Sequence, residues 1–300
     1  TPNSNRTTLY IQQYHTRTTT PSNNNIIHNN FIIMAKSSNI QAVFFDAGRT
    51  IWNRGGQKDI HEPDPPEFVE YCQQFGLETN QMMMGLCMQA TFGNPKALRG
   101  QVGGDDFLYD STYFQNEVFP KADENIVKLI KNNQLLPLID IMAMAQSSSR
   151  LVRPIINLIE RLRTPPTTYK ERVKIGIISD NIDFGFEHPY VMFSRKKNDN
   201  FESIQHLFDD VVNSCEIDMC KATNAVGMLK LACDRINVSP ENCIFIDDLP
   251  HNIEKAREIG MTGFVIDVTD KTNVDNIVKS VEYLCYGIKE SGISETRSKL

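Results

Sequence analysis

The sequence predicts an α/β fold, in which a doubly wound parallel sheet of the Rossmann-like kind carries a helical cap domain inserted after its first strand. Two observations lead to this prediction. Short continuous apolar runs, typical of parallel strands covered on both faces, alternate with longer amphipathic stretches of helical length. The alternation is interrupted over residues 54–169, which hold no comparable apolar strand. Alternating strands and helices form an open parallel sheet, and the interruption predicts a separate helical unit.

Four apolar runs are the expected strands of the sheet, at residues 42–46, 174–180, 243–248 and 263–267. Helices are expected between and after them. Residues 224–236 precede the third run, and residues 252–260 follow it and end in Gly260, which suits a helix C-cap. The last helix is expected over residues 273–288, where five apolar side chains share one face: Val274, Ile277, Val278, Val281 and Leu284.

The interruption at residues 54–169 is interpreted as a cap domain over the carboxyl ends of the strands, where open α/β sheets bind ligands. Its helices are expected at residues 65–76, 81–92 and 149–163, around a glycine-rich loop at residues 93–106. The core domain then comprises residues 38–53 and 170–288, and residues 1–37 and 289–300 are its tails.

The first tail differs from the rest of the chain in composition. It is rich in Thr, Asn and Ser, and the first acidic residue of the chain is Asp46. Such a segment is typical of a disordered tail. Because it is free of acids and carries Arg6 and Arg17, it also resembles an organelle targeting peptide in composition. We expect a cytoplasmic protein, with an organelle as the alternative.

Composition and charge disfavour several classes of function. The net charge of −6 and the isoelectric point near 5.6 disfavour a nucleic-acid partner, which needs a basic surface. No stretch approaches the roughly 18 consecutive apolar residues of a membrane span, so no membrane partner is expected. The seven cysteines contain no CxxC pair, which disfavours a structural zinc site and favours free thiols in a reducing compartment. We expect a monomer or a homodimer.

The polar side chains that end the first three expected strands form a candidate site. Asp46 ends the first, Ser179 and Asp180 end the second, and Asp247 and Asp248 end the third. Since parallel strands finish at one edge of the sheet, these side chains are expected to lie close together. Crowded carboxylates repel one another, and a hard divalent cation with oxygen ligands relieves that repulsion. The sequence therefore predicts a Mg²⁺ site at this edge.

Four motifs resemble those of the haloacid dehalogenase (HAD) superfamily of hydrolases. They are FFDAGRT at residues 44–50, IISDN at 177–181, SCEIDMCKA at 214–222 and FIDDLPHNIEKAREIGM at 245–261. The resemblance is greatest to the phosphatase-like branch that includes the N-terminal domain of soluble epoxide hydrolase. It covers the core and places residues 54–169 where the superfamily carries its cap. It implies a hydrolase of small phosphorylated substrates.

The resemblance also implies catalytic roles for individual residues. Asp46 would be the nucleophile that forms an aspartyl-phosphate, which water then hydrolyses. Ser179 and the backbone amides of Asp180 and Asn181 would hold the transferring phosphoryl oxygens, and Lys221 would neutralise the phosphate and orient Asp46. Thr50 is counted among the substrate-binding residues.

The same resemblance implies how the cation is held. The Asp46 carboxylate, the Gly48 carbonyl and Asp248 would bind Mg²⁺, which offsets charge in the transition state. Asp247 would support the site by pairing with Lys221. Asn252 would orient a water on the cation.

Each of these roles has a simpler structural alternative. Lys221 could be a solvated surface lysine, since its spacing to the acidic pair is longer than the superfamily usually shows. Ser179 could cap a following helix. Thr50 and Asn252 could be turn residues without a chemical role.

Residue 48 departs from the phosphatase pattern, because it is Gly where the second residue after the nucleophile is usually an Asp that protonates the leaving alcohol. Such acid–base catalysis contributes about 10²–10⁴-fold. Ala222 and Thr223 also stand where the superfamily commonly has Pro and an acid, and Asp180 where it has Asn.

Three functions stay open. The protein could be a Mg²⁺-dependent phosphatase that uses substrates with good leaving groups. It could be a catalytically weak or inactive protein that binds metal and a phosphorylated ligand or partner. It could also be a phosphonate or other carbon-bond hydrolase, although no cap lysine suited to that chemistry is identified. The acidic pair Asp247–Asp248 counts against dehalogenation, which uses neither the pair nor a metal.

Overall fold

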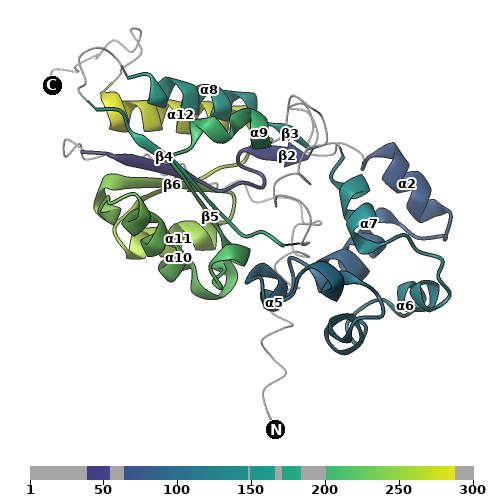
Figure 1. The fold of residues 1–300 in the computed structure, drawn as a ribbon. Helices are drawn as coiled ribbons and strands as arrows, with labels where there is room; N and C mark the ends of the chain where they lie inside the picture. The colour runs from purple at the N-terminus through teal and green to yellow at the C-terminus, as the bar shows by residue number, and fades with distance from the viewer. Residues whose placement is uncertain (1–38, 55–63, 148, 166–170, 184–200, 288–300) are drawn as a thin grey trace, which may run out of the picture. The chain divides into compact units, whose positions relative to one another are not determined.

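The core of the protein is a five-stranded parallel sheet, seen in a computed structural model that describes residues 39–54, 64–147, 149–165, 171–183 and 201–287. The strand order is β5–β4–β1–β6–β7, and each neighbouring pair is parallel (Figure 1). The strands, in chain order, are β1 (Ala42–Phe45), β4 (Lys174–Ser179), β5 (Asp210–Asn213), β6 (Cys243–Asp247) and β7 (Thr262–Val265). The four predicted strands and the predicted fold class are confirmed.

Strand β5 was not predicted. It holds two apolar residues between polar ones and pairs only with β4 at the edge of the sheet, with Ile177 opposite Val211. An edge strand that is half-covered lacks the continuous apolar run by which the central strands are recognised.

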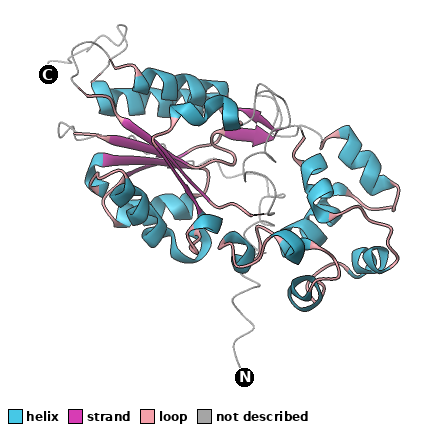
Figure 2. Cartoon of the chain, in the orientation of Figure 1, coloured by secondary structure: helices cyan, strands magenta, loops and turns pink. Residues whose placement is uncertain are grey.

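Helices cover both faces of the sheet, as Figure 2 shows. On one face, α8 (Arg153–Arg163) and α12 (Lys271–Tyr286) pack with Val43 and Phe45. On the other, α10 (Lys221–Arg235) and α11 (Pro250–Glu258) pack with Ala42 and Phe44. Consecutive side chains of β1 thus enter opposite apolar layers, as the two-residue period of a strand requires. The three predicted core helices are confirmed.

Shorter helices complete the core domain. These are α9 (Phe201–Ile204) and the 3₁₀ turns η5 (Gln205–Leu207), η6 (Ser214–Glu216) and η7 (Pro240–Asn242). The turn η6 directly follows β5 and leads toward Lys221, so the edge strand helps to place that residue.

The cap has an apolar core of its own, built around Phe68, Met82, Phe114, Ile126 and Ile141. Its helices are α2 (Pro66–Gln73), α3 (Thr79–Met82), α4 (Met88–Ala90), α5 (Pro95–Leu98), α6 (Glu124–Lys131) and α7 (Leu138–Ala145). A π-turn η1 (Met83–Cys87) joins α3 to α4, and the 3₁₀ helix η2 (Gly104–Phe107) and a second π-turn η3 (Phe114–Val118) precede α6.

A two-stranded antiparallel ribbon lies where the chain passes between core and cap. Strand β2 (Trp52–Arg54) pairs with β3 (Ser149–Leu151), with Trp52 opposite Leu151. The sequence had indicated a helix from residue 149, but the helix begins at Arg153 and its apolar face packs on the sheet. We therefore propose that the cap ends near residue 148 rather than at 169.

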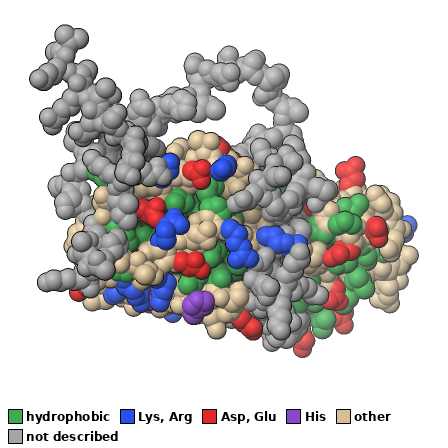
Figure 3. All heavy atoms as spheres, turned by 90° about the horizontal axis from the view of Figure 1, so that it is seen from above, with side chains coloured by type: hydrophobic (Ala, Val, Ile, Leu, Met, Phe, Trp, Pro, Cys, Tyr) green, Lys and Arg blue, Asp and Glu red, His purple; other side chains and the backbone are tan. Residues whose placement is uncertain are grey.

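The two predicted tails, residues 1–37 and 289–300, lie outside the described residues. Among the helices that are described, none combines the length and apolarity needed to cross a membrane. On the face shown in Figure 3, acidic and basic side chains are interspersed with hydrophobic ones. The described part of this face is therefore mixed in charge, rather than uniformly basic as nucleic-acid surfaces are.

Candidate active site

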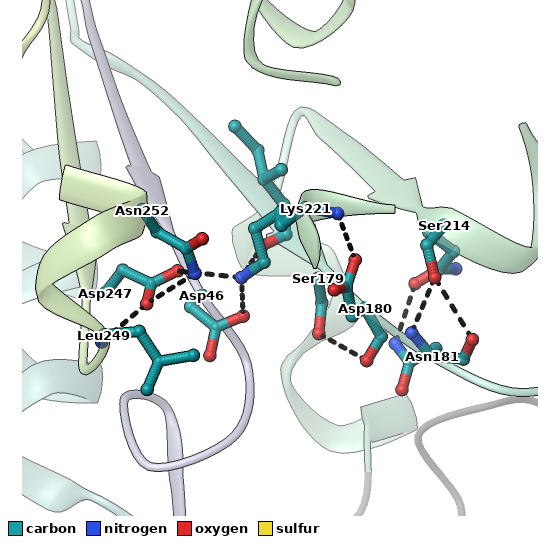
Figure 4. A network of polar contacts seen from close by, with 11 residues as sticks. Asp46, Ser179, Asp180, Asn181, Ser214, Lys221, Asp247, Leu249 and Asn252 are labelled. Carbon is teal, nitrogen blue, oxygen red and sulfur yellow. Dashed lines mark hydrogen bonds and ion pairs between the residues drawn. The ribbon is translucent and has the colours of Figure 1, made fainter. Parts of the chain in front are cut away.

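The predicted polar strand ends do lie together, at the carboxyl edge of the sheet (Figure 4). Asp46 directly follows β1, Ser179 ends β4 and Asp247 ends β6. Because β1 lies between β4 and β6, Asp46 is at the centre of the group. In β1, β4 and β6 these polar side chains follow runs of buried apolar residues, so they are brought together at the carboxyl ends of the strands.

Lys221 is buried at the centre of the site. Its Nζ donates to Asp46 Oδ1 at 2.5 Å, to Asp247 Oδ2 at 2.8 Å and to the Ile178 carbonyl at 3.3 Å. Burial by itself lowers the pKa of the ammonium group, but the charges of Asp247 and Asp46 outweigh burial and raise it. Lys221 is therefore a charged, fully engaged lysine, and the surface-lysine alternative is wrong.

The turn that carries Lys221 is fastened by Asp180. The Asp180 carboxylate accepts the backbone N–H of Lys221 at 2.8 Å. The regular part of α10 begins only after Asn224, whose backbone is non-helical (φ −148°, ψ 56°) and whose Oδ1 accepts the N–H of Gly227. This kink separates the turn at Lys221 from the helix proper, so Asp180 supplies the cap that the turn would otherwise lack.

Asp247 is completely buried, and each of its oxygens accepts two hydrogen bonds. In addition to Lys221, it accepts the Leu249 N–H at 2.8 Å and the Asn252 side-chain amide at 3.0 Å on each oxygen. A buried carboxylate is stable only with such partners. Asp247 thus holds Lys221 in place, which agrees with the supporting role expected of it.

Two other carboxyl groups are less well compensated. Burial, with the charges of Asp247 and Asp248, raises the pKa of Asp46 to about 8 against the opposing effect of Lys221. Burial and the charge of Asp247 raise the pKa of Asp248 to about 6, and Arg49 opposes this shift. Both shifts express the same cause, which is an excess of negative charge away from water.

This donor set fits a hard divalent cation. One carboxylate oxygen from each of Asp46, Asp247 and Asp248 lies within 4.8 Å of the others. When the described acids, histidines and cysteines are searched for groups of three or more that lie close enough together to hold a metal ion, these three aspartates are the group found. Asn252 Oδ1 is buried and unpartnered nearby, which suits an acceptor for water around a cation. All the ligands are oxygens, as Mg²⁺ and Ca²⁺ prefer.

The residues after β4 are arranged differently from what the sequence indicated. The Asn181 N–H donates to Ser214 Oγ at 2.9 Å, and its side-chain amide donates to Asn213 Oδ1 at 3.0 Å. Asn181 is thereby committed to joining the loop after β4 to the end of β5. Its amide does not face the site as a free phosphoryl donor in this arrangement, and its substrate-binding role stays a prediction.

Ser179 and Thr50 are both buried. The Ser179 hydroxyl has a long contact of 3.5 Å to the Asp180 carbonyl, which leaves it available to a ligand. Residues 180–183 are not helical, so Ser179 does not cap a helix directly after it. Thr50 is fully buried and its hydroxyl has no partner among the described residues. Direct substrate contact by Thr50 therefore stays a prediction.

Sequence reasoning missed three contributors to the site: Arg49, Asn213 and Ser214. Arg49 Nη1 lies 3.9 Å from Asp248 Oδ2. Ser214 begins one of the four quoted motifs, but its contact with Asn181 spans 33 positions in the chain. Asn213 ends the strand that was not predicted, so no signal in the sequence connected it with the site.

No protein-family model matches the chain. In structure comparisons it is similar to a HAD family enzyme from Bacteroides thetaiotaomicron in complex with magnesium and inorganic phosphate, with 14% identity and a TM-score of 0.50 over 77% of this chain and 96% of that one. It is also similar to an L-2-haloacid dehalogenase, with 16% identity and a TM-score of 0.46 over 76% of this chain and 86% of that one.

The chain has the fold of HAD-like hydrolases. The first comparison confirms, at the level of the fold, the resemblance that the four motifs indicated. The particular branch that includes the soluble epoxide hydrolase domain stays a prediction.

Proposed function

We propose that the protein is a Mg²⁺-dependent phosphatase of small phosphorylated metabolites, with Asp46 as the nucleophile. The observation that carries the proposal is the position of Asp46 at the centre of the carboxyl edge, held by buried Lys221 and beside Asp248. A nucleophilic carboxylate beside a fixed ammonium group and further acids is the arrangement that aspartyl-phosphate chemistry requires.

The reaction would proceed by two displacements at phosphorus. An oxygen of Asp46 attacks, a P–O bond to Asp46 forms, and the ester P–O bond breaks to release the alcohol. Water then attacks the aspartyl-phosphate, releasing inorganic phosphate and regenerating the carboxylate. Bound Mg²⁺ would supply electrostatic stabilisation of the phosphoryl oxygens.

Lys221 would do two things in this sequence. Its Nζ donates to Asp46 Oδ1 and so fixes the rotamer of the nucleophile, which leaves the other carboxylate oxygen to attack. Its positive charge favours the ionised form of Asp46, which is the reactive one. Asp46 and Asp248 would hold the cation with the Gly48 carbonyl, while Ser179 would donate to a phosphoryl oxygen.

The missing acid at residue 48 restricts the substrates. No side chain at that position protonates the departing oxygen, so the leaving group must depart as an anion or take its proton from water. We therefore propose acyl or aryl phosphates, whose leaving groups are weak bases, as the better substrates.

The test is turnover of 4-nitrophenyl phosphate with and without Mg²⁺, in wild type, Asp46→Asn and Asp248→Asn. We expect Mg²⁺-dependent turnover in wild type and its loss in both variants. Calorimetry should show that Asp248→Asn no longer binds Mg²⁺ although the protein stays folded by circular dichroism. Unchanged Mg²⁺ affinity in Asp248→Asn would contradict the site, and undiminished turnover in Asp46→Asn would contradict the nucleophile.

A second candidate function is binding of a phosphorylated ligand without turnover. It is favoured by Gly48 and by the engagement of the Asn181 amide with Ser214. The same samples distinguish the two: wild type that binds Mg²⁺ and inorganic phosphate by calorimetry but turns over neither aryl nor alkyl phosphates would support the binding function.

A further inference from the structure

Arg49 has an unusual place in the loop that follows the nucleophile. Its φ is +55°, in the left-handed region that a residue with a Cβ adopts at a steric cost, whereas Gly48 does not have a positive φ. An arginine is therefore held where glycine would be the unstrained choice. Non-glycine residues in this conformation cluster at functional sites, so the Arg49 side chain is a candidate for a role in the site.

The Arg49 guanidinium is exposed and only loosely engaged. Its side chain is 69% exposed, and its Nη1 is 3.9 Å from Asp248 Oδ2, too far for a hydrogen bond. Lys221, by contrast, is 5% exposed and committed to Asp46 and Asp247. Of these two cations, Arg49 is the one whose donors face the solvent from which a ligand arrives.

A cation at Asp46 and Asp248 would change what Arg49 faces. It would neutralise the Asp248 charge that now attracts the guanidinium, and it would repel the guanidinium as a like charge. Arg49 would then be an unpaired cation with several N–H donors at the rim of the phosphoryl site. The planar guanidinium binds carboxylate and phosphate oxygens in pairs, which a lysine cannot do.

We propose that Arg49 forms a second anion subsite beside the cation, so that the favoured ligands carry a phosphoryl group and a second anionic group, such as a carboxylate, a few bonds away. This inference rests on the proposed function, since it takes phosphoryl binding at Asp46 and Mg²⁺ as given. It adds a second anionic group to the acyl or aryl phosphates proposed above as the better substrates.

The experiment uses two phosphonates of similar size that lack a P–O–C ester bond. Phosphonoacetate carries a carboxylate and ethylphosphonate does not. With excess Mg²⁺ at pH 8, we expect wild type to bind phosphonoacetate about 5- to 20-fold more tightly by calorimetry, the gain of a charge-assisted bidentate contact at an exposed site. Arg49→Gln should reduce that preference to less than about 2-fold, and Arg49→Lys should retain part of it.

The same variant should act on Mg²⁺ in the opposite direction. Without phosphonate, Arg49→Gln should bind Mg²⁺ about 2- to 5-fold more tightly, because a neighbouring like charge is removed. A general loss of structure would weaken the binding of both phosphonoacetate and Mg²⁺. Weaker phosphonoacetate binding together with tighter Mg²⁺ binding therefore distinguishes a loss of recognition from misfolding. Lys255→Gln, which removes one exposed charge from an ion pair with Glu258 on α11, is the matched control and should change neither affinity.

The outcomes separate this inference from the function on which it rests. One contrary outcome is that wild type binds Mg²⁺ and then binds the two phosphonates equally tightly. Another is that Arg49→Gln keeps the preference for phosphonoacetate. In either case the Arg49 subsite is wrong and the proposed function stands. If wild type binds neither phosphonate in the presence of Mg²⁺, both proposals are wrong.

Discussion

Two layers of the site differ in how completely their charges are matched. The inner layer consists of Lys221, Asp247 and Asn252, whose charged groups are at most 5% exposed and joined by contacts of 2.8 to 3.0 Å. The outer layer consists of Gly48, Arg49 and Asp248, in which the ion pair spans 3.9 Å and the Arg49 side chain is 69% exposed. The charged groups of the inner layer are fully paired within the protein. Those of the outer layer are only partly paired, so a ligand can bind to them.

The difference follows from the cost of burying charge. A charge without water must find its partners within the protein, so an inner residue cannot change without leaving another one unpaired. An outer residue exchanges protein partners for water at little cost. We therefore expect the inner layer to determine whether the site exists, and the outer layer to determine which substrates it accepts and how fast it acts.

The largest effect is expected from breaking the inner layer. Lys221→Met leaves Asp46 and Asp247 facing each other without their shared cation, which should lower the free energy of unfolding by about 3–5 kcal/mol in the absence of Mg²⁺. Urea unfolding at pH 8 measures it. Lys255→Met, in an exposed pair, should change stability by less than about 1 kcal/mol. Equal losses in the two variants would show that the inner layer is no more important to stability than a surface pair.

The next effect is expected from adding to the outer layer. Gly48→Asp should place a carboxyl group beside the leaving oxygen and raise turnover of alkyl phosphates by about 10- to 10³-fold, the range that a positioned acid supplies. Aryl phosphates leave more readily without a proton and should gain far less. Because Gly48 does not have a positive φ, the substitution carries no left-handed strain.

The readout is the ratio of alkyl to aryl phosphate turnover before and after the substitution, with folding checked by circular dichroism. Gly76→Asp is a useful control. Because Gly76 has φ +67°, this variant should lose stability, but it should not change the ratio of alkyl to aryl phosphate turnover. A folded Gly48→Asp variant that hydrolyses neither substrate would mean that the proton donor is not the missing part, and the ligand-binding function would then be favoured.

The contrast between the layers also explains what the sequence could predict. Asp46, Ser179 and Asp247 were found because each ends an apolar run, and the geometry of a parallel sheet alone brings such ends together. The partnership of Lys221 with Asp247 was implied by the superfamily resemblance rather than by the pattern of residues. Within the inner layer, Asp247 was thus predictable because it ends a main strand, whereas Lys221 and Asn252 lie on α10 and α11 and were assigned only through the resemblance.

Other parts depend on contacts that no local pattern encodes. Strand β5 is an edge strand without a continuous apolar run, so Asn213 and its bond to Asn181 were not foreseen. No role in the site was predicted for Arg49, because an exposed arginine in a loop is common. Only its positive φ and its nearness to Asp248, which the structure shows, distinguish it. The ribbon of β2 and β3 has three residues in each strand, too few to show a period.

The smallest effect is the response of stability to Mg²⁺ and pH, which tests whether the carboxyl groups of Asp46 and of Asp248 in the outer layer need a ligand to offset their charge. In the metal-free protein, burial and neighbouring acids raise the pKa of Asp46 to about 8 and of Asp248 to about 6. Carboxyls with raised pKa values favour the folded state at low pH, and that contribution is lost as the pH rises through 6 and then 8. Mg²⁺ binds the ionised groups, so it should restore stability where protons no longer do.

We expect Mg²⁺, at ten times the Kd that it has at pH 8.5, to raise the free energy of unfolding by about 1.4 kcal/mol at that pH, which corresponds to roughly 3–6 °C in Tm. The same Mg²⁺ concentration should add almost nothing at pH 5. Thermal unfolding followed by circular dichroism, with and without Mg²⁺ across this range, measures the effect. Asp248→Asn removes a ligand and should abolish the response at every pH. A Mg²⁺ shift in Tm that is equal at pH 5 and pH 8.5 would show that the cation does not compete with protons on these carboxyls, and that it binds somewhere other than Asp46 and Asp248.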